Sequence, residues 1–496
     1  MKRILLILIS ICLLIQTVDA LPHPKREFRG AWIQCVNGQY LGKTSQQIKD
    51  MLMAQLDVLE EANINAIIFQ VRAEGDALYN SRLEPWSRYL TGKQGKAPSG
   101  GWDPLEWIID ECHKRDMELH AWINPYRAKT KGTTELAINH AAIQHPERIF
   151  KYGDLYIFNP ALEENREYTC EVVKDIVKRY DVDGIHIDDY FYPYPEQGLA
   201  IPDQKDFANS PNGFTNIDDW RRDNVNKLIK EMYETIHDTK PWVKFGISPF
   251  GIYRNSPNGI NSEEGSATNG LQNYDDLYAD IILWQDKGWV DYIVPQIYWN
   301  IGTKVADYDV LANWWNDYCN KRPLYIGQDV ERTVKGVSTI NSNEHQMRQK
   351  YQIQRSLSNI SGSCQWYAAA VVNNPGNYAT ILKNEIHRYP TLQPKMDFID
   401  KKAPKKPKKV RIELINNKTY LIWNSPKGKK EMDKAKQYVV YIFEPGEEID
   451  LSDGSNIATI THRQNFQLNS NLSGHTIIIT ALDRLHNESK GVKIKL

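Results

Sequence analysis

Two adjacent acidic residues follow an apolar run in the segment DGIHIDDYFYPYP, residues 183–195. If the run is a β-strand, alternation places His186 and Asp188 on one face and turns Asp189 toward the neighbouring strand or the helix layer. A carboxylate at such a strand end can serve as nucleophile, general base or anchor for a developing cation, the roles that glycoside hydrolysis requires. We therefore expect Asp188 to be catalytic; the alternative is an aspartate that caps the following loop.

A second carboxylate is needed to protonate the leaving oxygen, and two strand-end residues could supply it. Glu74 stands in QVRAEGDALY, and Asp329 stands in PLYIGQDV. Each has a structural alternative, because Glu74 could pair with the nearby Arg72 and a strand-end aspartate often caps a helix or loop. We expect one of the two to act as the acid while Asp188 is the nucleophile or base.

Further polar and aromatic residues at the ends of apolar runs suit contacts with sugars. Arg127 could clamp hydroxyls or a carboxylate, His186 could keep Asp188 charged, and aromatic rings could stack on sugar faces. A brace at the rim, a satisfied core histidine and barrel packing are the corresponding structural alternatives. The predicted substrate-binding residues are Arg72, Asn124, Tyr126, Arg127, His186, Asp189, Tyr190, Gln296, Tyr298, Trp299, Gln328 and Trp366.

The elements that must position these residues alternate along the chain. Eight short apolar, β-branched runs are separated by segments of helical period, which predicts a (β/α)8 barrel; a doubly wound open sheet is the alternative. In a barrel the strand ends converge on one face, so the candidate residues would meet there. The runs are FRGAWIQC, AIIFQVR, MELHAWI, GIHIDDY, VKFGISP, DYIVPQIYW, PLYIGQDV and GSCQWYAA.

The rest of the chain divides into recognisable parts. Residues 1–20 have a basic start, an apolar run and a V-x-A ending, which predicts a secretory signal and hence export to the periplasm or cell envelope. No other long apolar run exists, so no transmembrane segment is expected in the mature chain. The barrel is expected over 26–395 and a Lys/Pro-rich linker over 396–408. Period-two alternation over 409–496 predicts a small fibronectin type III-like β-sandwich for spacing or binding.

Composition and motifs argue against several other classes of protein. The 61 Lys and Arg balance 62 Asp and Glu, so nucleic acid is not an expected partner. The sequence has no HExxH motif and no CxxC pair, so neither a metal nor a cofactor is expected. Five widely spaced cysteines follow residue 20. We expect buried free thiols, with Cys35 and Cys364 the one pair to check for a disulfide.

Six segments in order resemble the motifs of the glycosyl-hydrolase-like 10 family, the former DUF187 group: FRGAWIQCVNG, FQVRAEGDALY, HAWINPYR, DGIHIDDYFYP, FGISPFGIYRN and DYIVPQIYWNIG. The resemblance covers about residues 26–390 and implies a (β/α)8 barrel. It also implies an exported hydrolase of an N-acetylhexosamine-containing polysaccharide, with peptidoglycan glycan strands lacking stem peptides as the substrate and an envelope or division-machinery protein as a possible partner. A non-catalytic envelope glycan-binding protein and a hydrolase of a dietary or capsular polysaccharide are the alternatives.

Two wider resemblances leave the general acid unassigned. The amylase-like pattern G-F-R-x-D aligns Asp188 with its nucleophile, but its strand-five glutamate has no counterpart in VKFGISPFG. The family 18 chitinase pattern D-G-x-D-x-D-x-E aligns Asp188 with the aspartate that orients an N-acetyl group, while the acid glutamate falls on Tyr190. A second mechanism therefore stays open, in which the N-acetyl group of the substrate attacks and Asp188 steadies it.

Overall fold

The computed structural model describes residues 23–133, 135–468 and 472–496, so the predicted signal peptide at 1–20 lies outside the described residues. Eight parallel strands close into a barrel in which each strand neighbours the next in chain order and the last pairs with the first. The predicted barrel is confirmed, and the open-sheet alternative is wrong. The strands are β1 (Phe28–Ile33), β2 (Ala66–Arg72), β3 (Glu118–Ile123), β7 (Gly184–Ile187), β8 (Lys244–Ile247), β9 (Tyr292–Ile293), β10 (Leu324–Asp329) and β11 (Ile360–Trp366).

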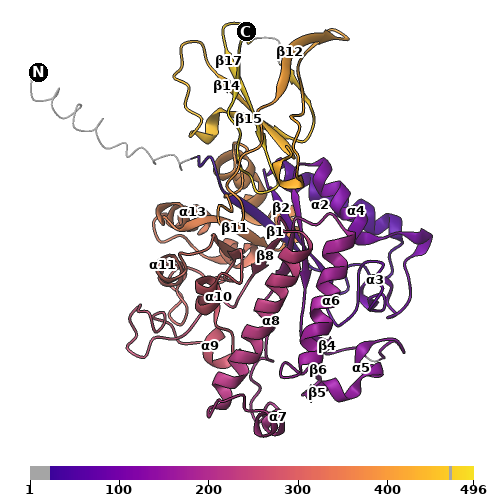
Figure 1. Ribbon diagram of the computed structural model, residues 1–496. Coiled ribbons are helices and arrows are strands. Elements are labelled where there is room, and N and C mark those ends of the chain that lie inside the picture. The colour runs from indigo at the N-terminus through magenta and orange to yellow at the C-terminus, as the bar shows by residue number, and fades with distance from the viewer. Residues whose placement is uncertain (1–22, 134, 469–471) are drawn as a thin grey trace, which may run out of the picture.

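Helices surround the barrel, so its strands are buried on both faces (Figure 1). Local signals set the helix ends: Thr44 forms a capping box with Gln47, Asp103 caps the helix that begins at Pro104, and Gly288 ends another in the left-handed region. The longer helices are α2 (Ser45–Glu61), α4 (Pro104–Lys114), α6 (Glu163–Arg179), α8 (Ile217–Thr239), α10 (Ile281–Lys287), α11 (Tyr308–Tyr318) and α13 (Met347–Ser356). Shorter ones are α3 (Arg88–Thr91), α5 (Ala141–Gln144), α7 (Gln204–Asn209), α9 (Asn273–Asp276), α12 (Val330–Lys335), α14 (Ala368–Val372) and α15 (Tyr378–Ile381).

One excursion from the barrel matters for the site. After β3 the chain builds a three-stranded antiparallel sheet from β4 (Arg127–Lys129), β5 (Ile149–Tyr152) and β6 (Leu155–Phe158).

Among the described residues, no helix combines the length and the apolar character needed to cross a membrane. Cys35 and Cys364 are both buried free thiols.

Residues 408–468 and 472–495 form two antiparallel sheets beyond the barrel. They contain β12 (Lys408–Ile415), β13 (Lys418–Asn424) and β16 (Asn465–Leu468), and β14 (Gln437–Phe443), β15 (Ile457–Thr461), β17 (Thr476–Leu482) and β18 (Val492–Lys495). Trp423 and Tyr438 pack in the core between them. This C-terminal domain therefore confirms the all-β expectation, while its boundary and its fibronectin type III likeness stay predictions.

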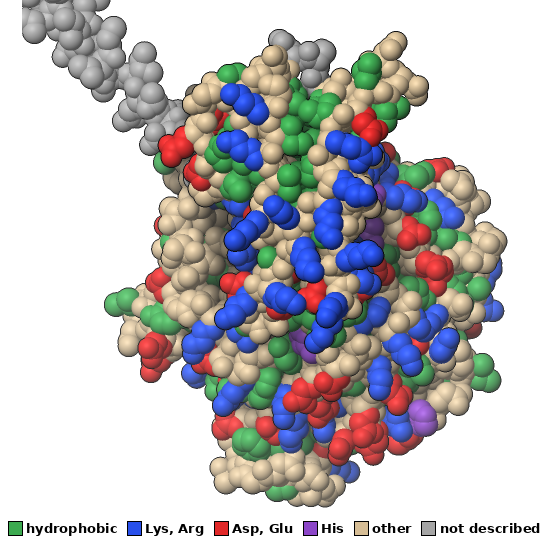
Figure 2. Space-filling model, turned by 45° about the horizontal axis from the view of Figure 1, so that its top comes forward, with side chains coloured by type: hydrophobic (Ala, Val, Ile, Leu, Met, Phe, Trp, Pro, Cys, Tyr) green, Lys and Arg blue, Asp and Glu red, His purple; other side chains and the backbone are tan. Residues whose placement is uncertain are grey.

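The C-terminal domain docks at the barrel end where the strands begin. The Gln437 side chain donates to the carbonyl of Asp116, and His486 contacts Glu118, the first residue of β3. Lys and Arg side chains spread over the face of the molecule that this domain presents (Figure 2). The opposite end of the barrel, where the strands finish, is left free for a cleft.

The barrel interior holds a layer of large rings that needs glycine beside it. Tyr292, Tyr325 and Phe28 stack in this layer. Gly246 on β8 pairs with Tyr292, and a Cβ atom at Gly246 would lie 1.8 Å from Cζ of the Tyr292 ring. The ring can occupy its place only because residue 246 has no side chain.

We predict that Gly246→Ala lowers the free energy of unfolding by about 2–3 kcal/mol, because the new methyl group displaces the Tyr292 ring. Denaturant unfolding measures the change. Gly270→Ala is the control, since its nearest contact would be the flexible end of Ile252 at 3.1 Å. An unchanged unfolding free energy for Gly246→Ala would show that the layer is not tightly packed.

Candidate active site

A cleft of about 500 Å³ opens where the barrel strands end. Its lining comes from segments far apart in the chain, which the barrel brings to one rim. The acidic side chains that line it, among the residues described, are Asp188 and Asp189. The other polar and aromatic residues of the lining are Trp32, Asn37, Gln70, Tyr89, Trp122, Asn124, Arg127, Thr130, Lys131, Tyr190, Ser248, Gln296, Tyr298 and Trp366.

A line of amides holds Asp188. The backbone N–H of Cys35 donates to Oε1 of Gln70 at 3.0 Å, and Nε2 of Gln70 donates to Oδ1 of Asn124 at 2.8 Å. The amide group of Asn124 is thereby turned so that its Nδ2 donates to both oxygens of Asp188, each at 2.8 Å. The backbone N–H of Tyr190 adds a contact at 3.3 Å. These donors fix the carboxyl group at the cleft wall.

Asp189 lies in the same cleft, contrary to the expectation that it turns away. Strand β7 ends at Ile187, so strand alternation no longer governs the two residues that follow it. The Tyr194 hydroxyl donates to Oδ2 of Asp189, and the Gln296 side chain is a second hydrogen-bond partner. The adjacent carboxylates therefore form a pair within one site.

The pair cannot lose both protons easily. Burial, followed by the charge of Asp189, raises the pKa of Asp188 to about 7. Burial also raises the pKa of Asp189, while hydrogen bonds from Tyr194 and Gln296 oppose this shift. The guanidinium of Arg127, which lies 3.2 Å from the centre of the Tyr190 ring, lowers the pKa of both carboxyls. We assign the retained proton to Asp188 and the negative charge to Asp189.

The structure does not bring Glu74 to the cleft as the second carboxylate. Its side chain is fully buried, and Arg88, Thr133 and Tyr89 all contact its carboxylate oxygens. Burial alone would raise the pKa of Glu74, but hydrogen bonds from Arg88 and Thr130 lower this pKa below its ordinary value. A charged carboxylate without access to the cleft has no proton for a leaving group.

Asp329 and Arg72 also serve other contacts. The Asp329 carboxylate caps α12 by accepting from the backbone N–H of Arg332 at 2.8 Å, and it does not line the cleft. Arg72 is buried and pairs with Glu84 at 2.7 Å rather than with Glu74, and it also donates to the carbonyl of Asn124. Its role here is to hold the Asn124 backbone rather than to contact substrate.

Four further predicted residues lie outside the cleft lining. His186 is fully buried and contacts Ser248 rather than Asp188. Gln328 donates to the Tyr378 hydroxyl at 2.8 Å. Tyr126 is buried in the main core, and Trp299 packs against Phe250. Polar type at a strand end therefore did not suffice to identify cleft residues.

The remaining predicted residues do line the cleft: Asn124, Arg127, Asp188, Asp189, Tyr190, Gln296, Tyr298 and Trp366. Tyr298 and Trp366 stack with ring centroids 6.1 Å apart, which gives one wall an aromatic surface. Gln70, Ser248 and Trp32 were missed. The signal for Gln70 was a glutamine inside the strand AIIFQVR, whose one other polar residue is Arg72. In the described part of the chain, no group of three or more His, Cys, Asp or Glu side chains is arranged to hold a metal ion.

A closed parallel barrel with a carboxyl pair at its mouth has the organisation of a glycoside hydrolase. Residues 27–346 match the Glycosyl hydrolase-like 10 family model, and the chain belongs to this family. It is 39% identical over 486 residues to Glycosyl hydrolase YngK of Bacillus subtilis, covering 94% of this chain and 93% of that protein. It is also 39% identical over 288 residues to Glycosyl hydrolase DigH of Escherichia coli K12, covering 56% of this chain and 64% of DigH. The protein is a glycoside hydrolase.

We predict that Asp188→Asn stabilises the protein above pH 7 by on the order of 2–4 kcal/mol. The pKa of Asp188 is about 7 in the folded protein against 3.8 ordinarily, so deprotonation destabilises the fold as pH rises between these values. An asparagine side chain has no carboxyl proton to lose, so the variant does not lose stability in this way as the pH rises. Unfolding measured at pH 4 and pH 8 checks it: the two proteins should differ little at pH 4. A variant that is less stable than wild type at pH 8 would contradict the raised pKa.

Proposed function

We propose that this hydrolase cleaves an N-acetylhexosamine-containing polysaccharide by a substrate-assisted mechanism, and that it acts after export on peptidoglycan glycan strands lacking stem peptides. One observation carries the mechanism: the cleft acidic residues are the neighbours Asp188 and Asp189. The resemblance of the six motifs to the family supports the substrate, and the signal-like residues 1–20 support the location.

Direct displacement uses two carboxylates that flank the glycosidic bond. Here both carboxylates follow the same strand, and the candidates from other strands, Glu74 and Asp329, bind protein groups instead. An acetamido oxygen on the sugar can take the place of the missing nucleophile. This reasoning favours the N-acetyl mechanism over the acid–nucleophile pair, with the roles of the aspartates changed from the expectation: Asp189 steadies the acetamido group and Asp188 is the acid.

The steps follow from where the proton lies. The acetamido oxygen attacks C1, the bond from C1 to the leaving oxygen breaks, and Asp188 gives that oxygen its proton. The Asp189 carboxylate accepts the acetamido N–H and stabilises the positive charge of the ring that forms. Asp188 then takes a proton from the water that attacks C1 and reopens the ring. Two inversions at C1 retain its configuration.

Aromatic rings provide the surface for the sugars. Trp366 stacks on Tyr298 and meets Trp122 and Trp32 edge-on, and all four rings line the cleft. Flat rings of this kind bind the apolar faces of pyranose units. Arg127 adds donors at the rim beside Tyr190.

We predict that Asp188→Asn lowers kcat/KM on polymeric glycan by about 10²–10⁴-fold, because the leaving oxygen is then not protonated. The same variant should keep most of its kcat/KM on a dinitrophenyl glycoside of an N-acetylglucosamine oligosaccharide, because that leaving group needs no proton. Its kcat on this substrate should fall, because the water that attacks C1 in the second step has lost its base. Asp189→Asn should be impaired on both substrates. Released reducing ends and dinitrophenolate are the measurements.

Asp329→Asn is the matched control, since asparagine also caps a helix and Asp329 lies outside the cleft lining. If Asp188→Asn lowers kcat/KM by the same factor on both substrates, Asp188 is not the acid. Cleavage of a glycan with a 2-hydroxyl in place of the acetamido group would show that the mechanism is not substrate-assisted. A wild-type protein that sediments with glycan but releases no reducing ends on any glycan would be a binding protein.

The pH profile gives a separate prediction. Because Asp188 must be protonated to act as the acid, kcat/KM should fall about tenfold per pH unit above its pKa of about 7. The Arg127 charge lowers that pKa, so Arg127→Met should move the alkaline limb to higher pH. Initial rates from pH 4 to 10 check both. A limb that stays in place in Arg127→Met would show that another group controls it.

A further inference from the structure

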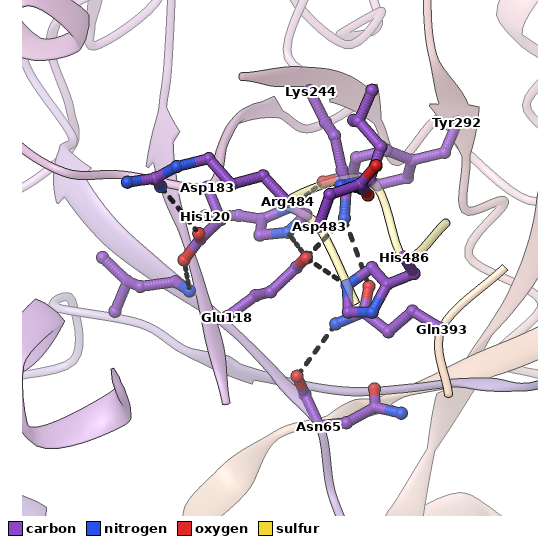
Figure 3. Close-up of polar contacts among 12 residues, drawn as sticks. Asn65, Glu118, His120, Asp183, Lys244, Tyr292, Gln393, Asp483, Arg484 and His486 are labelled. Carbon is purple, nitrogen blue, oxygen red and sulfur yellow. Dashed lines mark hydrogen bonds and ion pairs between the residues drawn. The ribbon is translucent and has the colours of Figure 1, made fainter. Parts of the chain in front are cut away.

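A continuous line of hydrogen-bonded side chains crosses the barrel interior, and it begins at the C-terminal domain. His486 of that domain contacts Glu118 at 2.7 Å, as does Lys244 at 2.6 Å (Figure 3). Glu118 Oε2 lies 2.9 Å from Nε2 of His120, and Nδ1 of His120 lies 2.6 Å from the Tyr292 hydroxyl. We call the barrel end where the strands begin the floor, and these contacts form the half of the line nearest to it.

The line continues to the cleft. The Tyr292 hydroxyl lies 3.0 Å from Nδ1 of His186, and Nε2 of His186 lies 2.9 Å from Oγ of Ser248, which lines the cleft. We call the residues Glu118, His120, Tyr292, His186 and Ser248 the barrel column. All five are buried, in a place that barrels usually fill with branched apolar side chains.

The floor end sets the direction of the first hydrogen bond. Burial alone would raise the pKa of Glu118. The Lys244 charge and hydrogen bonds from His120 and His486 instead hold this pKa well below its ordinary value. An ionised carboxylate only accepts, so Nε2 of His120 carries a hydrogen and donates to it. The other ring nitrogen of His120, Nδ1, faces the Tyr292 hydroxyl.

The cleft end fixes the direction of the remaining hydrogen bonds. Nε1–H of Trp32 can only donate, and it points at Nε2 of His186 from 3.5 Å. Burial lowers the pKa of His186 well below its ordinary value, so the ring is neutral. Nε2 of His186 is therefore the acceptor, and Nδ1–H donates to the oxygen of Tyr292. With its oxygen accepting from His186, the single hydroxyl hydrogen of Tyr292 goes to His120.

We propose that the barrel column fixes Ser248 as a hydrogen-bond acceptor in the cleft. Its hydroxyl hydrogen is held by Nε2 of His186, so only oxygen lone pairs face the bound sugar. Ser248 then accepts from an O–H or acetamido N–H group of the substrate and positions it against the carboxyl pair. Identifying this donor as part of a sugar rests on the proposed function; the direction of the column does not.

The position of Ser248 fits this role. Its backbone carbonyl accepts from Nε2 of Gln296 at 2.9 Å, and Gln296 is also a partner of Asp189. The serine is thus anchored on both its main chain and its side chain, next to the residue that carries the negative charge. Tyr292 and His186 are positioning residues, because they act through Ser248 without lining the cleft.

The direction can be tested without substrate. In the full-length protein labelled with ¹⁵N-histidine, ring-nitrogen spectra should show His186 protonated on Nδ1 and His120 on Nε2. Assignment comes from the variants His186→Gln and His120→Gln. In Tyr292→Phe the downfield proton of His186 should be lost, since its acceptor is gone. His186 protonated on Nε2 would overturn the proposal whatever the protein hydrolyses.

The effect on the cleft is tested by glycan affinity in the Asp188→Asn protein, measured calorimetrically with an N-acetylglucosamine-containing glycan. Ser248→Ala should weaken binding about three- to tenfold, the loss of one neutral hydrogen bond. Tyr292→Phe should weaken it by no more than that, and the double variant should bind no more weakly than Ser248→Ala alone. Tyr325→Phe, which removes a hydroxyl from the same ring layer outside the column, should bind like the parent.

Additive losses in the double variant would overturn the proposal, because Tyr292 would then act on the cleft by another route. Thermal unfolding of each variant shows that it is folded. If the parent protein binds no glycan and wild type cuts none, the proposed function fails, and the histidine spectra alone decide the column.

Discussion

The site depends on one constraint: two carboxyl groups are held side by side out of water. Two like charges in such a place are costly, so the pair retains a proton near neutral pH. The surroundings decide which carboxyl group keeps this proton. Tyr194 and Gln296 each donate to Asp189, whereas a single amide nitrogen of Asn124 donates to both oxygens of Asp188. Adjacent residues in one strand–loop junction thereby receive different protonation states.

The orientation of these donors comes from the barrel rather than from the cleft. The amide of Asn124 is turned by Gln70, which is held by the backbone N–H of Cys35. The hydroxyl of Ser248 is turned by His186 from below. Each line meets a group that can only donate, the backbone N–H of Cys35 in one and the indole N–H of Trp32 beside His186 in the other, and these donors set the hydrogen-bond directions. Catalytic groups supported in this way need little reorganisation when substrate arrives.

The sequence predicted the barrel because its strands are short apolar runs at regular intervals, and it predicted Asp188 because a carboxylate directly follows one of them. It misjudged Asp189, since strand alternation ends at Ile187 and the backbone turns immediately afterwards. It also could not exclude Glu74. The groups that bind this carboxylate, Arg88 at the start of α3 and Thr133 after β4, come 14 and 59 residues later, from segments whose path no local pattern encodes.

The barrel column was beyond sequence reasoning for a related reason. His186 and Tyr292 are 106 residues apart, and each alone resembles a satisfied core residue. Such a column persists only if every member is paired, because an unmatched buried polar group costs more than an apolar substitute. Its first member, Glu118, needs Lys244 and the domain residue His486 for that balance. The C-terminal domain docks at the floor and the cleft opens at the other end, and the barrel column is a hydrogen-bonded connection between them.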